Sequence, residues 1–160
     1  MTKSPYVRNP ARLADLIAAI QVMGTYRFAS RLAERWETRL GRRPVSAANW
    51  GALFLEHPEF FTIQDGSVSL VWRRSMVRNY DTREGRTLSF EEASAMALQD
   101  KEVAEQRLSR PPLDASQMVK LVDIAINIHE REIQHQQERR WWIGAVLVIL
   151  GIVLGAVLKA

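Results

Sequence analysis

Cysteine does not occur among the 160 residues of this chain, which excludes disulfide bonds, thiolate zinc sites and cysteine nucleophiles. Two common catalytic motifs are also missing, a glycine-rich phosphate loop before Lys-Ser/Thr and a Gly-x-Ser-x-Gly nucleophile elbow. His129 and Glu130 begin like a zinc-protease helix, but Ile133 stands where the second histidine is required. Glu132 and His135 have the spacing of half a di-iron ligand set, in a stretch typical of a solvated helix face. We therefore expect no enzymatic activity, no cofactor and no metal site.

Charge is absent from residues 141–158, and a helix of this length rises about 27 Å, close to the apolar thickness of a bilayer. The start of this run carries residues typical of the cytoplasmic membrane interface: Arg139, Arg140, Trp141 and Trp142. The polar N-terminus shows no secretory signal pattern. We therefore expect a tail-anchored, single-pass membrane protein with a cytoplasmic N-terminus and the lipid bilayer as a partner. A buried C-terminal helix of an oligomer is the alternative.

Helix breakers are missing between Ala115 and the apolar run, so one continuous helix is expected there. Two apolar stripes fit a coiled-coil seam: Val119, Val122, Ile126 and Ile133, and beside them Met118, Leu121, Ala125 and Ile128. Packing of this helix on the preceding one, as a hairpin, is the alternative. Small residues that let membrane helices approach closely recur within the run: Gly144, Gly151 and Gly155. We therefore expect a homo-oligomer, assembled through the stalk and the span.

Positive charge is concentrated in the first half of the chain. Residues 1–80 hold twelve Lys or Arg against six Asp or Glu, whereas residues 81–140 hold nine against twelve. Nearly all basic residues of the first half are arginine, whose planar fork suits phosphate and carboxylate groups. The expected contacts to an anionic partner are Arg31, Arg35, Arg39, Arg42, Arg43, Arg73, Arg74 and Arg78. An ordinary solvated surface is the alternative for these residues.

Periodicity, caps and breakers predict five elements in the first half of the chain. They are helices from Asn9-Pro10 to Gly24, from Ser30 to Gly41 and from Ser46 to His57, a short extended piece at Tyr26–Ala29, and a hairpin turning at Asp65-Gly66. Two strands alone are not stable in water, so the hairpin is expected to pack on the three helices. Residues 75–88 show no period and several turn formers, which is typical of a linker. Ser89 and Glu92 form a capping box that predicts a helix to about Leu108.

The order helix, strand, helix, helix, strand, turn, strand over about Arg12 to Arg73 resembles that of winged-helix domains. The segment RLGRRPVSAANWGALFLEHPEFFTIQDGSVSLVW is also similar to the LOTUS (OST-HTH) type. Winged-helix domains bind DNA, RNA or proteins, and the fold alone does not choose among them. The whole chain is expected to be α+β, mostly α. Its expected parts are a winged helix (three helices and a β-hairpin) at 9–74, a linker at 75–88, a helical hairpin or stalk at 89–140, and one transmembrane helix at 141–158.

The expected third helix argues against sequence-specific reading of duplex DNA. From Ser46 to His57 it has no Arg or Lys, only Asn49 and His57 could contact a base edge, and Glu56 would repel phosphate. The favoured hypothesis is therefore a tail-anchored protein whose cytoplasmic winged-helix domain mediates macromolecular, mainly protein, interaction. The alternatives are a membrane-anchored DNA- or RNA-binding regulator and an oligomerising effector that disturbs the bilayer.

Overall fold

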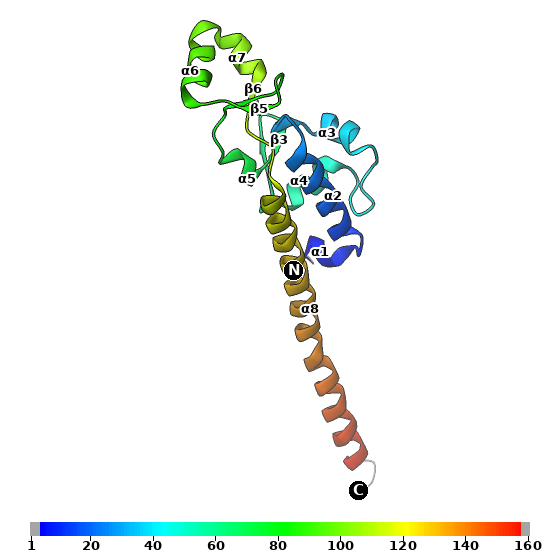
Figure 1. Cartoon of the computed structure of the whole chain (residues 1–160). Helices are drawn as coiled ribbons and strands as arrows, with labels where there is room; N and C mark the ends of the chain where they lie inside the picture. Colours follow the sequence, from blue (N-terminus) through cyan, green and yellow to red (C-terminus); the bar gives the residue numbers. More distant parts are fainter. Residues whose placement is uncertain (1–3, 158–160) are drawn as a thin grey trace.

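Helices dominate the fold, and two small antiparallel sheets accompany them (Figure 1). The computed structural model describes the backbone of residues 4–157 and the side chains of residues 4–138. The helices are α1 (Pro5–Arg8), α2 (Arg12–Thr25), α3 (Ala33–Leu40), α4 (Trp50–Glu56), α5 (Val71–Arg74), α6 (Phe90–Gln99), α7 (Lys101–Arg107) and α8 (Ala115–Val157). The strands are β1 (Ser30–Leu32), β2 (Phe61–Gln64), β3 (Ser67–Leu70), β4 (Tyr80–Asp81), β5 (Arg86–Thr87) and β6 (Leu108–Ser109). The predicted α+β, mostly α class is therefore confirmed.

The first sheet joins the predicted hairpin to a strand from earlier in the chain, in the order β1-β3-β2. The hairpin turns at Asp65 and Gly66, as predicted, with positive φ angles of 50° and 74°. This pair suits a two-residue turn because Asp and Gly tolerate the left-handed conformation. β1 pairs Arg31 with Val68, so the extended piece that pairs in the sheet comes after the predicted range 26–29.

Local caps set two of the helix ends in residues 4–74, which we call the head. Gly41 ends α3 with a φ of 70°, and the Asn49 side chain begins α4 by accepting a backbone N–H three residues on at 2.8 Å. The predicted start of this helix at Ser46 is wrong because the Ser46 hydroxyl donates to Asp15 at 2.8 Å instead. The other predicted cap, Ser30, lies within β1, so the second helix also begins later than expected.

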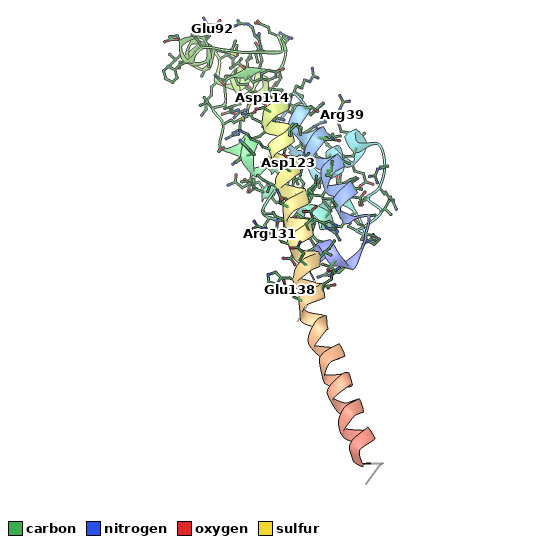
Figure 2. The ribbon with its side chains drawn as sticks, turned by 60° about the horizontal axis from the view of Figure 1, so that its bottom comes forward. Arg39, Glu92, Asp114, Asp123, Arg131 and Glu138 are labelled. Carbon is green, nitrogen blue, oxygen red and sulfur yellow. The ribbon has the colours of Figure 1, made fainter. Side chains whose placement is uncertain are left out.

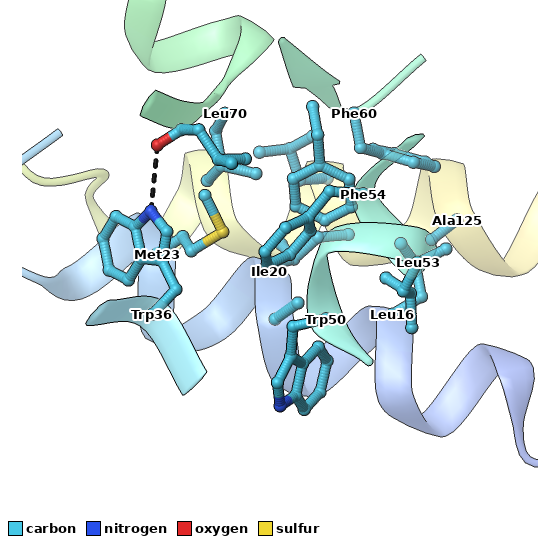
Figure 3. Close-up of a cluster of buried hydrophobic side chains, with 14 of the residues drawn as sticks. Leu16, Ile20, Met23, Trp36, Trp50, Leu53, Phe54, Phe60, Leu70 and Ala125 are labelled. Atoms are coloured by element: carbon cyan, nitrogen blue, oxygen red, sulfur yellow. Dashed lines mark hydrogen bonds between the residues drawn. The ribbon is translucent and has the colours of Figure 1, made fainter. Parts of the chain in front are cut away.

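The core of the head lies between α2, α4, the first sheet and α8 (Figure 3). Leu16, Ile20 and Met23 project from α2 at helical spacing and are fully buried. They belong to a cluster that also contains Trp36, Trp50, Leu53, Phe54, Phe60, Leu70 and Ala125. The dashed line in Figure 3 is the bond from Trp36 Nε1 to the Val68 carbonyl, 2.9 Å long. This bond satisfies the one polar group of the indole and fixes α3 on β3.

A second, smaller sheet has the order β5-β4-β6, and two of its strands, β4 and β5, lie in the segment expected to be a linker. Asp81 is buried at its centre, where Arg107 donates from Nε at 2.9 Å and from Nη2 at 2.5 Å. These bonds hold the pKa of Asp81 at about 2, well below its usual value. Strands of two residues that pair across more than twenty positions leave no periodic signal, which is why the sequence predicted only turns here.

The capping box before α6 is confirmed. Ser89 Oγ accepts the Glu92 backbone N–H at 3.1 Å, and the Glu92 carboxylate accepts the Ser89 N–H at 2.7 Å. The predicted single helix is interrupted, because the Asp100 side chain accepts the Val103 N–H at 3.0 Å and starts α7. Residues 80–109 hold seven Asp or Glu against four Lys or Arg, and we call them the acidic lobe. Figure 1 shows this lobe at the end of the molecule opposite the C-terminus.

The helix α8 runs beside α2 and α1 and then continues beyond the head (Figure 1). Leu121 and Ala125 are buried in the core cluster, and Met118 and Ile128 are half-buried against it. One of the two stripes considered for a coiled-coil seam therefore covers the head of its own chain. The main contacts of α8 are with α2 and α1, and not with α6 or α7 as a hairpin of consecutive helices would require.

Across the residues that the structure describes, no helix is both long enough and apolar enough to cross a bilayer. This finding contradicts the predicted transmembrane helix at 141–158, the tail anchor, and the single-pass membrane localisation with a cytoplasmic N-terminus. The physical reason lies in the described side chains of α8, from Ala115 to Glu138: one face packs on the head through Leu121 and Ala125, and the segment includes six charged residues. The residues assigned to the membrane interface and to span packing have side chains outside the described part: Arg139, Arg140, Trp141, Trp142, Gly144, Gly151 and Gly155.

Candidate functional site

Three arginines lie over two aromatic rings where α2 leads into β1 and α3, and a fourth, Arg35, lines a hollow together with one of these rings. These residues, which we call the arginine–aromatic surface, are Tyr26, Arg27, Phe28, Arg31, Arg35 and Arg39. Arg27, Arg35 and Arg39 are exposed, and the other three are half-buried. Figure 2 shows Arg39 at the outer margin of the head.

Tyr26 is the centre of this surface. The Arg39 and Arg31 guanidinium carbons lie 4.5 and 5.2 Å from its ring centroid, and Arg31 Nη1 donates to its hydroxyl at 3.3 Å. The Phe28 ring lies 5.8 Å from that of Tyr26 and carries the Arg27 guanidinium at 5.1 Å. Each such cation–π contact contributes about 0.5–1 kcal/mol at an exposed site. The rings thus hold the guanidinium groups in place and leave most of their N–H donors for another acceptor.

Local structure explains how the rings reach this position. The Tyr26 backbone N–H caps α2 by donating to the Val22 carbonyl at 3.1 Å, and the chain then continues extended toward β1. The edge of the Tyr26 ring packs on Trp36, with ring centroids 5.7 Å apart. Because Trp36 is fully buried in α3, Arg35 and Arg39 stand on the outer side of that helix, one turn apart.

Positive charge on this surface is not neutralised within the described part of the chain, where none of its four arginines forms an ion pair. Arg12, Arg42 and Arg43 of the head are paired with carboxylates, and Arg12 Nη1 lies 2.6 Å from Glu56 Oε2. The described surface therefore presents four uncompensated cations beside partly exposed rings. Such an arrangement favours a ligand that has anionic groups and some apolar or aromatic surface.

A shallow hollow of about 380 Å³ opens at one end of the surface. Its lining residues are Phe28, Ser30, Arg31, Leu32, Arg35 and Ser67. Binding sites for small ligands are lined mainly by apolar side chains, and a few polar groups fix the orientation of the ligand. Here Phe28 and Leu32 supply apolar area, and two arginines supply donors for an anionic group.

Arg42 and Arg43, which were predicted to contact an anionic partner, have partners of their own. Arg42 Nη1 lies 2.8 Å from Asp15 Oδ1, and Arg43 Nε lies 3.7 Å from Glu37. Burial of Asp15 opposes its ionisation, but hydrogen bonds from Ser46 and Arg42 outweigh burial and keep its pKa below the usual value. Arg42 is therefore engaged in the head, whereas the exposed Arg43 forms only a long surface pair.

Arg73 is placed in the interior and not on the surface, since its side chain is 0% exposed. Its guanidinium donates to the carbonyls of Met23, Tyr26 and Arg110 at 2.7, 2.7 and 2.6 Å. Burial lowers the pKa of Arg73 to about 10, and no carboxylate is among its bonded partners. Arg73 joins the end of α2 to the segment before α8, so its role is structural.

Arg74 and Arg78 lie with Arg110 in a second basic group. Arg74 donates to the Gln64 side chain, and Arg78 Nε donates to the Leu108 carbonyl at 2.8 Å. Arg110 Nε donates to the Arg74 carbonyl at 3.0 Å. Burial and the nearby charges of Arg74 and Arg78 lower the pKa of Arg110, which reflects the crowding of like charges.

Three members of the arginine–aromatic surface were not identified from the sequence: Tyr26, Arg27 and Phe28. They fall within the short extended piece that the sequence predicted at Tyr26–Ala29, to which no binding role was assigned. The available signal was the alternation Tyr-Arg-Phe just before an arginine stripe, since interleaved aromatic and basic residues are typical of surfaces that bind anionic polymers.

The helix α4 offers a different surface. It contains no Lys or Arg, and its Leu55 side chain is 70% exposed. Among the described residues, no group of three or more His, Asp or Glu side chains is placed to hold a metal ion. No family model, curated protein or solved structure matches this chain. The function is therefore inferred from the structure of this chain alone.

Proposed function

We propose that this chain is an interaction protein and not an enzyme, and that its head is a winged-helix-like domain. The order α2, β1, α3, α4, β2 and β3 supports this assignment, because an early strand completes a sheet with a C-terminal hairpin. The packing of α3 on both α2 and α4 also supports it, since three helices then surround one core.

The ligand of the head is an acidic segment of a partner protein, held on the arginine–aromatic surface. The single observation that carries this proposal is the set of four arginines without ion pairs around Tyr26 and Phe28. Carboxylates of the partner pair with Arg31, Arg35 and Arg39, and its apolar side chains lie on the rings and in the hollow. Electrostatic attraction of this kind raises the association rate and makes binding sensitive to salt.

Two features favour a protein over a continuous polyanion. Glu34 and Glu37 alternate with Arg35 and Arg39 along α3, so a phosphate backbone following the helix would meet negative charges as well. The helix that enters the major groove in many winged helices is α4 here, and it presents Leu55 without any basic residue.

Single-stranded nucleic acid is the second candidate ligand. Bases stack on aromatic rings and phosphates pair with arginine, and the arginine–aromatic surface offers both within about one nucleotide length. This candidate shares its contact residues with the favoured one, so the two are separated by comparing the affinities of two probes and not by mutation alone.

The test uses the full chain and two labelled probes, a peptide alternating Glu with Phe or Leu, and oligouridine RNA. Fluorescence anisotropy over a salt series measures both dissociation constants. We expect the peptide to bind more tightly, and the double variant Arg31→Ala/Arg39→Ala to weaken it at least about tenfold. The matched control is Arg83→Ala/Arg131→Ala, which removes the same charge from two exposed arginines elsewhere.

Equal losses in the two double variants would show that only net charge matters and would refute the assigned surface. Tighter binding of RNA than of the peptide, lost in Arg31→Ala/Arg39→Ala, would select the second candidate. Absence of binding to either probe at low salt would remove the surface as a binding site for anionic polymers.

A further inference from the structure

An apolar groove of about 610 Å³ lies between the end of α4, strand β2 and helix α5. Its lining residues are Phe54, Leu55, Pro58, Phe61, Thr62, Ile63, Val71, Arg74 and Ser75. Leu55, Ile63 and Val71 are all exposed, although each is a large apolar side chain. Several exposed apolar residues that adjoin in one groove are typical of an interaction site and not of ordinary surface.

The edge of this groove is basic. Arg74 lines it, and Arg78 and Arg110 lie near Arg74. None of these three arginines forms an ion pair within residues 4–138. A segment that fills the groove is therefore stabilised if it places a carboxylate beside its apolar side chains.

Helix α6 of the acidic lobe has this combination of residues. Phe90 and Leu98 are 79% and 88% exposed, the two most exposed large apolar side chains among the described residues. Glu91 and Glu102 lie close to them in sequence, are exposed and form no ion pair in the described part of the chain. Figure 2 shows the lobe, marked by Glu92, at the end of the molecule remote from Glu138.

We propose that the groove of one copy receives helix α6 of a second copy of this chain. Phe90 and Leu98 enter the apolar groove, and Glu91 pairs with Arg74 at its edge. Complementarity of both charge and polarity identifies the occupant, because the chain carries an apolar groove with a basic edge and an apolar helix with an acidic edge. Each copy has both halves, so two copies engage reciprocally and close a dimer.

This dimer does not depend on the stripe of α8 that covers the head, since Leu121 and Ala125 are already buried there. It is also independent of the arginine–aromatic surface, because the two sites share no residue. Two small contacts of this kind support a modest affinity, with a dissociation constant on the order of 10 µM.

Sedimentation velocity of the full chain tests the proposal over about 1 to 100 µM, a range that brackets this affinity. We expect the mass to rise from the monomer value of 18.3 kDa to twice that value with concentration. Leu55→Glu in the groove and Leu98→Glu on α6 each raise the dissociation constant at least about tenfold. Both positions are exposed, so circular dichroism is expected to show an unchanged fold.

Two mixing experiments identify which surfaces meet. Leu55→Glu keeps α6 intact and Leu98→Glu keeps the groove intact, so a mixture regains one of the two contacts and associates more strongly than either variant alone. Arg74→Glu weakens the dimer, and adding Glu91→Arg to the same chain restores it by reversing both charges.

A monomer at 100 µM overturns the proposal, as does a dimer that tolerates both Leu55→Glu and Leu98→Glu. Loss of the dimer in the control Val119→Glu/Ile133→Glu, with wild-type behaviour of the groove variants, would assign self-association to the exposed stripe of α8 instead. Failure of the charge reversal to restore the dimer overturns the pairing of Glu91 with Arg74.

Discussion

Replacing the buried Arg73 with methionine is expected to destabilise the protein by about 3 kcal/mol. The guanidinium donates to three backbone carbonyls, and each bond from a charged group contributes roughly 1.5–3 kcal/mol when its loss leaves the partner unsatisfied. Methionine fills part of the volume of the arginine side chain, and the substitution removes a buried charge that no carboxylate neutralises. These two gains offset about half of the free energy lost with the hydrogen bonds, which leaves the net value above.

Urea unfolding, followed by tryptophan fluorescence, measures this loss. With a denaturant slope of about 2 kcal/mol per molar, the transition midpoint should fall by about 1.5 M. The matched control is Arg74→Met at the next position, where the exposed side chain is expected to change stability by less than about 0.5 kcal/mol. Measurements at about 1 µM protein keep the proposed dimer from contributing.

Equal shifts of the midpoint in the two variants would refute a structural role of Arg73, because the structure places only Arg73 in the interior. An unchanged unfolding midpoint of Arg73→Met together with lost binding to anionic probes would also refute it. That outcome would indicate that Arg73 contacts an anionic partner at the surface, as the sequence predicted.

Three further predictions concern stability, and urea unfolding measures each of them. Asp81→Asn should lower the unfolding free energy by about 1–2 kcal/mol at pH 7. The pKa of Asp81 is about 2 in the fold, against an ordinary value of 3.8 for an Asp side chain. The stability that this group contributes is therefore present above about pH 4 and is lost toward pH 2. A difference in unfolding free energy between wild type and variant that stays constant over that range would refute this prediction. Gly66→Ala should lower the unfolding free energy by about 1 kcal/mol, because the φ of Gly66 is 74° and alanine adopts positive φ only with strain. An unchanged unfolding midpoint would contradict the hairpin turn. Leu121→Ala should lower the unfolding free energy by about 2–4 kcal/mol, and replacing the exposed Val119 with alanine should lower it by less than about 0.5 kcal/mol. Equal effects of the two substitutions would mean that α8 does not pack on the head as described.

Features that depend on a few neighbouring residues were predictable from the sequence. The capping box of Ser89 and Glu92, the turn at Asp65 and Gly66, and the stop at Gly41 all occur where the sequence placed them. Each is decided within about four residues by backbone geometry and by one side-chain hydrogen bond, so no distant part of the chain has to be known.

The candidate site was predictable only in part. The spacing of Arg31, Arg35 and Arg39 indicated a basic stripe, and the structure does bring these three together. Arg73 and Arg74 could not be told apart from the sequence, since both are arginines that follow a strand. Only Arg73 donates to three carbonyls of distant segments. The apolar run at residues 141–158 was likewise interpreted by its composition alone, and the described helices do not support the span it suggested.

The amino-acid sequence by itself determined the class of the fold, the hairpin turn, the capping box at Ser89, the helix stop at Gly41 and the basic character of the head. Only the tertiary structure decided which stripe of α8 is covered, which arginine is buried, and which rings hold the others at the surface. The physical reason is that periodicity marks an apolar face but not the surface it packs against. Such partners lie far apart along the chain, as Met23 and Arg73 do, and they meet only when the whole core has formed.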